Sequence, residues 1–552
     1  MARSPDSSNS KLILGRVLSM SPSDPGEASA VLVRDGNVVA VGGAEVRDLA
    51  TDEGATVHDF GERIVLPGFT DPHAHFAGSS LASETMVDCR IPLCRTIEDI
   101  QGQLSQAREK AERSGWLIGQ AGLFLDQRLK ERRFPTRREL DRVSDTLPIA
   151  LRTGGHATVL NSAAMNLLDL DSAQGIHGSA DIDKENGIIR ELEYLVPSPQ
   201  LDPVELRRVL RERAADLFLA NGVTAVGEIA EDVDSVMAAD EMAAAGDFPL
   251  RLALYLWVPA IMSFDDAIEP GALALTADSE QMRVAGIKMF VDGGYSSATA
   301  AVKTPFQAPY CIAGHEHGKL GMTKEEVMSV IERSIGAGLT VALHSNGERA
   351  QQLACEATVE SGVDGSKVRI EHAGNYVTDQ STVEGWRRAG ILPVPNPKFL
   401  NEFGGLLPER LGEPGTHGRW PFKSLLEDGW RISNSSDIFP GANDECTNPL
   451  FSMWCSVARR SPEDDSIEPE EAISVMDALN MSTLYAAEAI GAGDRRGTLE
   501  PGKQADIVVL DRDVFSVDMD EIKEVKVDSV FVDGEIVHER EGADPQRSVA
   551  SI

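Results

Sequence analysis

The feature that most constrains the fold is a repeated alternation of short apolar, β-branched segments with helical stretches. Strands are expected at residues 64–73, 223–230, 251–258, 284–293, 338–347, 367–374, 391–397 and 430–437. Helices are expected between most of them, at residues 204–220, 233–245, 324–337, 348–361, 380–389 and 420–428. Eight strands that are each followed by a helix are the pattern of a (β/α)8 TIM barrel, an α/β fold.

Two further regions flank and interrupt this repeat. The two ends of the chain carry short alternating strands, with hairpin turns expected at Asp35–Asn37 and at Asp533-Gly534. Neither end can bury a two-sided sheet alone, so we expect them to pair into one small β-sandwich. The gap after the first barrel strand is too long for one crossover and predicts an insertion lobe above the barrel mouth. The predicted domains are the terminal β-sandwich (1–66 plus 497–552), the barrel (67–80 plus 206–496) and the lobe (81–205).

Composition excludes several other classes of protein. The chain has 552 residues, of which 42% are hydrophobic, which argues against disorder, collagen or coiled coil as the main architecture. A net charge of −36 lacks the basic footprint that nucleic acid or an anionic membrane requires. The longest apolar stretch, residues 252–264, contains Pro259 and is too short to span a bilayer. The six scattered cysteines form no CxxC pair, and no export signal opens the chain, so a cytoplasmic protein with reduced thiols is expected.

Polar residues that can bind metals lie at or near the ends of five expected strands. His73 and His75 end the first strand and point the same way, because strand side chains repeat every two residues. The other four positions are Lys288, His344, His372 and Asp437. Active sites of barrels lie at the C-terminal ends of the strands, and polar groups there are costly unless paired. A metal cluster accounts for all six residues together, whereas a pair of structural histidines would explain only the first motif.

Lys288 leaves two interpretations open. As an ammonium it repels a cation, but carbamylation by CO2 would turn its nitrogen into an anionic carboxylate that can bridge two divalent ions. The alternative is an ordinary amine that orients substrate beside a single ion. The sequence does not choose between them, and the carbamate is the hypothesis that we favour.

At these residues the chain resembles a known family. It is similar to the amidohydrolase superfamily, in its YtcJ-like or N-substituted formamide deformylase-like branch (amidohydrolase family 3), in the segments LPGFTDPHAHF, GGHATVLNSAAM, IKMFVDGGYSSATA, VALHSNGERA, VRIEHAG and ISNSSDIFP and in the stretch from ALNMSTLYAAEAIG to RRGTLEPGKQADIVVLD. The HxH, Lys, His, His, Asp series is typical of the superfamily. The family usually has Ser or Ala after the Asp-Gly that follows the lysine, whereas this chain has Gly294 and then Tyr295. That departure leaves the substrate pocket unpredicted.

The resemblance implies two divalent ions, with zinc as the expected metal. His73, His75 and Asp437 would hold the more buried ion, His344 and His372 the outer one, and carbamylated Lys288 would bridge them. A hydroxide generated between the ions would attack the carbonyl carbon. Asp437 would take the proton of the attacking water and pass it to the leaving nitrogen.

Other residues are candidates for contact with the substrate. His156, in the insert, is expected to contact the substrate or its oxyanion, with a purely structural histidine as the alternative. Asp292, Tyr295 and Arg349 are candidate substrate-binding residues, although Asp292 could instead cap a loop. Glu371 points away from its neighbour His372 and is expected to pack against Arg369 or a helix.

The expected function is hydrolysis of a C–N bond outside peptides, in an N-acyl or N-formyl amide or a cyclic amide. The same hydroxide could attack an aryl ester or a carbamate, and a non-catalytic binding protein on the same fold is the competing class. The complete ligand series weighs against that class. The expected partner is a small-molecule amide, and a homodimer is expected by analogy with the fold.

Overall fold

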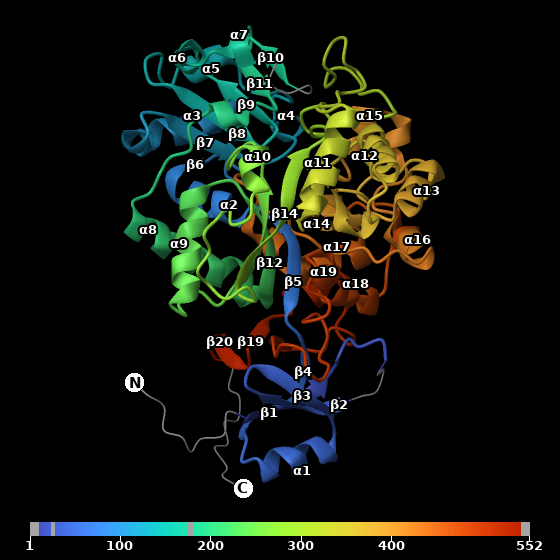
Figure 1. Ribbon diagram of the computed structural model, residues 1–552. Coiled ribbons are helices and arrows are strands. Elements are labelled where there is room, and N and C mark those ends of the chain that lie inside the picture. The colour runs from blue at the N-terminus through green and yellow to red at the C-terminus, as the bar shows by residue number, and fades with distance from the viewer. Residues whose placement is uncertain (1–9, 24–27, 174–179, 543–552) are drawn as a thin grey trace.

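The computed structural model describes residues 10–23, 28–173 and 180–542. A central barrel separates an upper lobe from a sheet below it that contains strands from both ends of the chain (Figure 1). The ends of the predicted terminal domain, residues 1–9 and 543–552, lie outside the described residues. None of the described helices combines the length and the apolar character needed to cross a bilayer.

The barrel sheet is parallel and confirms the predicted fold class. Its strands follow the order β17-β16-β15-β14-β13-β12-β5. They are β5 (Phe69–Ala74), β12 (Val223–Ala230), β13 (Arg251–Trp257), β14 (Met282–Phe290), β15 (Thr340–His344), β16 (Val368–Glu371) and β17 (Leu392–Val394). All eight residues of β12 are buried, because helices cover the outer face and side chains fill the inside.

The expected eighth strand, residues 430–437, is not a strand in the structure. This polar segment, named the closing segment below, has no regular structure and runs beside β5, where Asp437 N–H donates to the His73 carbonyl oxygen at 2.8 Å. On its other side the Ser435 hydroxyl donates to the Pro395 carbonyl oxygen at 2.8 Å. Side-chain hydrogen bonds thus replace part of the backbone ladder that a regular strand would form, and they complete the barrel wall.

The expected first strand is divided between two sheets. β4 (Thr56–Pro67) belongs to the terminal sheet, and β5 begins at Phe69 in the barrel. Gly68 separates them, and a Cβ there would lie 2.5 Å from the Thr224 hydroxyl oxygen. The chain therefore needs a glycine at this point, where it passes from one sheet to the other against β12.

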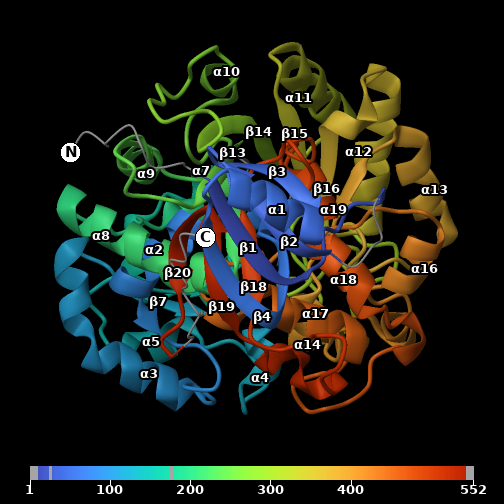
Figure 2. The ribbon, with the colours of Figure 1, turned by 90° about the horizontal axis from the view of Figure 1, so that it is seen from below.

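Helices surround the barrel strands, as the view from below shows (Figure 2). Those predicted between the strands are α8 (Pro203–Arg213), α9 (Val233–Ala244), α11 (Lys324–Gly336), α12 (Glu348–Ser361), α13 (Gln380–Ala389) and α16 (Phe422–Glu427). The others in this part of the chain are α2 (Phe76–Thr85), α10 (Phe264–Ala267), α14 (Lys398–Phe403), α15 (Leu407–Leu411), α17 (Pro449–Ala458), α18 (Val475–Ser482) and α19 (Leu484–Ala489). Local signals set several boundaries. Thr323 and Glu326, for example, form a capping box that starts α11.

The lobe contains its own six-stranded sheet, in the order β10-β11-β9-β8-β7-β6. The strands are β6 (Val87–Asp88), β7 (Leu117–Ala121), β8 (Ile149–Thr153), β9 (Ala157–Leu160), β10 (Asp181–Asp183) and β11 (Ile188–Arg190). Its helices are α3 (Ile97–Gln106), α4 (Leu125–Arg128), α5 (Arg137–Asp141), α6 (Ser162–Leu167) and α7 (Leu170–Ala173). The tight turn between β8 and β9 uses positive φ at Gly154 and Gly155 and carries His156.

The terminal sheet joins strands from both ends of the chain, in the order β20-β19-β18-β4-β1-β2-β3. Besides β4 it contains β1 (Ser10–Val17), β2 (Ala28–Arg34), β3 (Asn37–Gly42), β18 (Ile507–Leu510), β19 (Val527–Val532) and β20 (Glu535–Glu539), with α1 (Ala44–Asp52) packed on it. Both predicted hairpin turns form, at Asp35-Gly36 and Asp533-Gly534, with positive φ at all four residues. The sheet curls so far that Val38 N–H, on the edge strand β3, donates to the Lys503 carbonyl oxygen just before β18. Both ends therefore share one core.

Candidate active site

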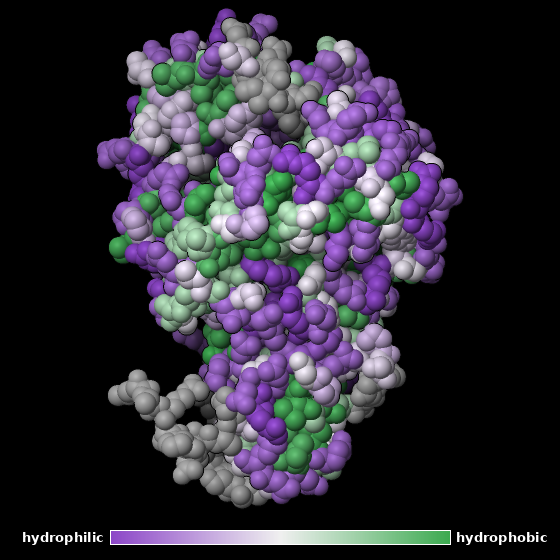
Figure 3. Space-filling model, viewed as in Figure 1, coloured by the Kyte–Doolittle hydropathy of each residue, from purple (hydrophilic) through white to green (hydrophobic). Residues whose placement is uncertain are grey.

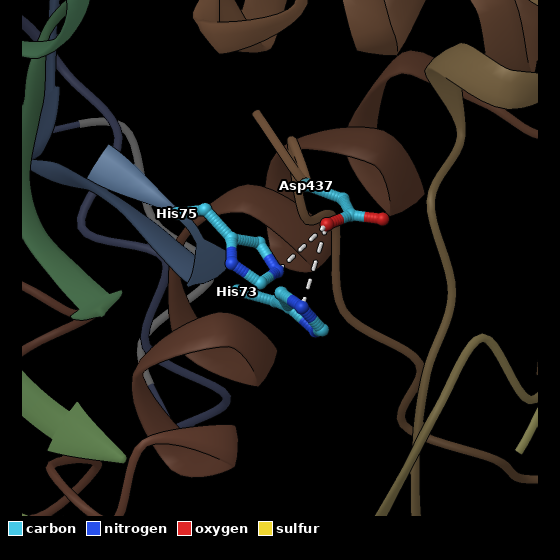
Figure 4. A group of neighbouring side chains, drawn as sticks. All are labelled: His73, His75 and Asp437. Carbon is cyan, nitrogen blue, oxygen red and sulfur yellow. Dashed lines mark ion pairs between the residues drawn. The ribbon is translucent and has the colours of Figure 1, made fainter. Parts of the chain in front are cut away.

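Two histidines and one carboxylate converge where β5 meets the closing segment (Figure 4). The Nε2 atoms of His73 and His75 lie 3.4 and 3.7 Å from Asp437 Oδ1. All three residues are buried, and one potential ligand atom of each lies within 4.8 Å of the others. Although burial raises the pKa of the Asp437 carboxyl, the neighbouring histidines hold it below its usual range. Imidazole nitrogens and an ionised carboxylate that share one small space fit a zinc-like divalent ion.

A second pair of histidines lies beside this group. His344 ends β15 and His372 directly follows β16, and His372 Nε2 lies 3.0 Å from His344 Nδ1. The other nitrogen of His372, Nδ1, lies 2.7 Å from the Asn396 Oδ1 acceptor, which assigns the proton to Nδ1. Burial lowers the pKa of His372 to about 3 and keeps its ring neutral. The neutral Nε2 can therefore serve as a metal ligand.

Lys288 lies near the end of β14 and is fully buried. Its Nζ is 3.5 Å from His73 Nε2 and 5.1 Å from the centre of the Phe290 ring. Burial lowers its pKa to about 8, although Glu371 and Asp437 oppose this effect. The structure thus brings all six predicted ligand positions to one end of the barrel.

Two carboxylates contact the Nδ1 atoms of His73 and His75, on the side of each ring away from Asp437. Glu371 contacts His73 Nδ1, and its other oxygen accepts from Arg369 at 2.9 Å, so the expected packing against Arg369 is present. Glu231 Oε1 lies 2.5 Å from His75 Nδ1. Each carboxylate occupies one ring nitrogen and leaves Nε2 facing Asp437, an arrangement typical of metal-binding histidines. Sequence reasoning missed Glu231, although it directly follows the correctly predicted strand β12.

The lobe brings His156 into the same cavity. The His156 ring centre lies 5.2 Å from that of His344, and its Nδ1 lies 3.1 Å from Glu191 Oε2. Burial alone would lower the pKa of His156, but the Glu191 carboxylate raises it to about 9, so the ring is cationic at neutral pH. A Cβ on Gly294 would lie 2.7 Å from a ring carbon of His156. The unusual glycine therefore makes room for this imidazole.

These groups face one cavity of about 110 Å³ between barrel and lobe. Seven aromatic residues line it: Phe124, Trp257, Phe290, Tyr295, Phe399, Phe403 and Phe439. Arg152 and Glu193, both from the lobe, add polar side chains to the wall, and burial raises the pKa of Glu193 to about 8. Sequence reasoning missed both, because nothing local indicates how the lobe packs against the barrel.

Of the three candidate substrate-binding residues, only Tyr295 lines the cavity. Asp292 has the geometry of the expected alternative, a residue that caps a loop: its carboxyl group accepts from the backbone N–H groups of Ala301, Asn346 and Gly347 at 2.8–2.9 Å, and it is fully buried. It ties the loops after β14 and β15 together and does not face the cavity. Arg349 is a correction, because the first turn of α12 directs it outward, where it is exposed and donates to a loop carbonyl oxygen.

A parallel barrel with such a cluster at the C-terminal ends of its strands defines a metal-dependent hydrolase. The sequence matches the amidohydrolase family over residues 56–538, and the chain belongs to that family. It hydrolyses C–N bonds other than peptide bonds, as the motif resemblance implied. Its substrate is therefore a small molecule.

Individual proteins extend this comparison. The chain is 28% identical to an N-substituted formamide deformylase of Arthrobacter pascens, over 94% of this chain and 96% of that protein. It is 24% identical to the putative amidohydrolase YtcJ of Bacillus subtilis, over 86% and 89% of the two chains. A metal-dependent hydrolase of Pyrococcus horikoshii shares the fold, with a TM-score of 0.69 at 22% identity over 93% of this chain and 99% of that one.

Proposed function

We propose that the protein hydrolyses an N-acyl or N-formyl amide, or a cyclic amide, with two zinc ions. The observation that carries this proposal is the meeting of four histidines, a lysine and an aspartate in one buried place. In this proposal His73, His75 and Asp437 would hold one ion, and His344 and His372 would hold the other. Lys288, as a carbamate, would be a ligand of both. The similarity to an N-substituted formamide deformylase supports the choice of substrate class.

The chain's own groups have distinct parts in this reaction. Divalent ions held there would supply Lewis acidity toward water and toward the scissile carbonyl. Asp437, held ionised by its neighbours, accepts the proton of the attacking water and delivers it to the leaving nitrogen. The His156 imidazolium donates a hydrogen bond to the carbonyl oxygen as negative charge develops on it. Glu371 and Glu231 keep the first histidine pair in its orientation.

The cavity supports a compact substrate. Its volume of about 110 Å³ is small beside the ~300–1,000 Å³ of pockets for drug-sized ligands. A formyl group is the smallest acyl group and leaves room on the nitrogen side. The aromatic wall excludes water from the remaining space, which strengthens every electrostatic contact inside.

The test is an assay of purified protein loaded with zinc and bicarbonate. The substrates are N-formyl amines, N-acetyl amines and cyclic amides, in water enriched in ¹⁸O. We expect amine release from at least the N-formyl series, with one ¹⁸O atom incorporated into the acid product. Absence of amine release from all three series, or product without the label, would contradict the proposal. Hydrolysis confined to aryl esters or carbamates would replace it.

We also propose that the protein is a cytoplasmic homodimer. Its six cysteines lie in the described chain, five of them buried, and all are free thiols, as in a reducing compartment. The dimer rests on analogy with the fold. Light scattering during gel filtration would distinguish a dimer from a chain of 59.5 kDa.

A further inference from the structure

The wall that the lobe contributes to the cavity carries two ionisable side chains that the proposed reaction does not use. Arg152 lies on β8, two residues before the first glycine of the turn that carries His156, and Glu193 follows β11. Both line the cavity, together with Glu231 from the barrel side. Arg152 and Glu193 have no part in holding the metal ligands.

Neither side chain is satisfied by the protein. Of the five N–H donors of Arg152, the structure pairs one, through Nη2 to the Val196 carbonyl oxygen at 2.9 Å, and Nε has no partner. The Glu193 Oε1 atom also has no hydrogen-bond partner. Within the described chain, neither residue takes part in an ion pair, although both line the same cavity. Buried polar groups left in this state cost free energy unless a ligand satisfies them.

The arrangement of charge narrows the kind of group that fits. A lone anion would meet the carboxyl groups of Glu193 and Glu231, and a lone cation would meet Arg152 and the His156 imidazolium. An apolar group would leave both lobe side chains without partners. A neutral carboxamide matches both, because its carbonyl oxygen accepts from a guanidinium N–H and its own N–H donates to a carboxyl oxygen. A Glu193 carboxyl can accept that N–H whether or not it carries a proton.

We propose that Arg152 and Glu193 form a subsite for a carboxamide that the substrate carries beyond the scissile amide. The preferred substrates would then be N-acylated amino amides. This inference rests on the proposed amide hydrolysis and names the substrate class within it. Arg152 and Glu193 would act by binding, with the gain concentrated in KM.

Three substrates of equal size test the subsite. N-formylglycinamide offers the carboxamide, N-formylglycine replaces it with a carboxylate, and N-isobutylformamide replaces it with two methyl groups. We expect kcat/KM for the carboxamide to exceed that for each of the others by about tenfold or more, the effect of one or two buried hydrogen bonds. Equal values, or preference for the carboxylate, would overturn the subsite and leave the proposed hydrolysis standing. Hydrolysis of none of the three would overturn the proposed hydrolysis of formamides itself.

Variants locate the preference. Arg152→Met and Glu193→Met should each bring the ratio of kcat/KM between carboxamide and isobutyl substrates toward one, mainly through a higher KM for the carboxamide. Arg142→Met makes the same change at an exposed arginine of the lobe and should keep the wild-type ratio. Because the ratio is measured within each preparation, a smaller folded fraction does not affect it. A wild-type ratio in both cavity variants would overturn the proposal.

Discussion

At the scale of single residues, the position of His156 depends on the absence of a side chain at residue 294. Gly294 follows barrel strand β14 and His156 lies in the lobe, and a methyl group on the glycine would overlap the imidazole. The glycine departs from the Ser or Ala usual in the family. The cationic ring can therefore approach His344 to 5.2 Å between ring centres.

Gly294→Ala tests this position. The added methyl group should displace His156, and kcat for amide hydrolysis should fall, by up to the roughly 10²–10³-fold that loss of an oxyanion donor costs. Gly102→Ala, in α3 with open space around its Cα, is the matched control and should leave kcat unchanged. Wild-type kcat in Gly294→Ala would remove His156 from the proposed role.

Asp437→Asn separates metal binding from proton transfer. The asparagine keeps an oxygen near the Nε2 atoms of His73 and His75, so much of the bound metal should remain. Turnover should fall by about 10²–10⁴-fold, because the amide cannot accept the proton. Elemental analysis and kcat, measured on the same preparation, check both parts. Near-normal turnover would exclude Asp437 as the proton carrier.

At the scale of elements, local sequence signals predicted the barrel well where each strand is buried on both faces. β12 and α12, for example, have the predicted bounds, because an apolar run or a helical stretch fixes them locally. Residues 430–437 were expected to form a regular strand, and this was wrong, since their hydrogen bonds to β5 and to Pro395 depend on distant residues. Five of the six proposed ligand positions could be predicted because they lie in or directly after the last residues of a barrel strand, and Asp437 lies at the end of the segment that closes the barrel. Arg152 and Glu193 could not, because the packing of the lobe on the barrel places them.

The Asp292 side chain connects the loop after β14 to the loop after β15 through hydrogen bonds. Asp292→Ala should lower the free energy of unfolding by roughly 3 kcal/mol, since three backbone N–H groups lose their shared acceptor. Hydrogen exchange at Ala301, Asn346 and Gly347 should accelerate in the same variant. Asp145→Ala removes an exposed carboxylate and should change the free energy of unfolding by no more than about 0.5 kcal/mol. Unchanged hydrogen-exchange rates at all three amides would show that the hydrogen bonds of Asp292 do not order these loops.

At the scale of the whole molecule, an ion cluster joins the barrel to the terminal sheet. Arg251, at the start of β13, binds both oxygens of Asp506 at 2.9 Å and one oxygen of Asp533 at 2.7 Å. The side chains of Arg251 and Asp506 are each 3% exposed. Figure 3 shows a largely hydrophilic surface with scattered apolar areas, which suits the acidic composition. The Arg251–Asp506 pair is therefore shielded from solvent, unlike the charged side chains on the surface.

Arg251→Met should lower the free energy of unfolding by about 3–5 kcal/mol, because it leaves the Asp506 carboxylate buried without its ion-pair partner. Although burial raises the pKa of Asp506, Arg251 holds it below the usual 3.8. A lowered carboxyl pKa stabilises the folded state above about pH 4, and this contribution is lost as the pH falls further. The difference between wild type and variant, measured by urea unfolding, should thus narrow below pH 4. If the difference in free energy of unfolding between wild type and Arg251→Met stayed constant down to pH 3, this explanation would be contradicted. The control Arg142→Met should have the wild-type free energy of unfolding both above and below pH 4.

The most direct test of the central claim is the metal content per chain, measured by elemental analysis of protein purified without chelator. We predict two zinc ions for the wild type. Lys288→Ala should contain clearly less metal, partly restored by added short carboxylates that take the place of the carbamate. One ion per wild-type chain, or full occupancy in Lys288→Ala, would contradict a lysine-bridged pair. A chain that binds no metal even after incubation with zinc and bicarbonate would contradict the whole account of the site.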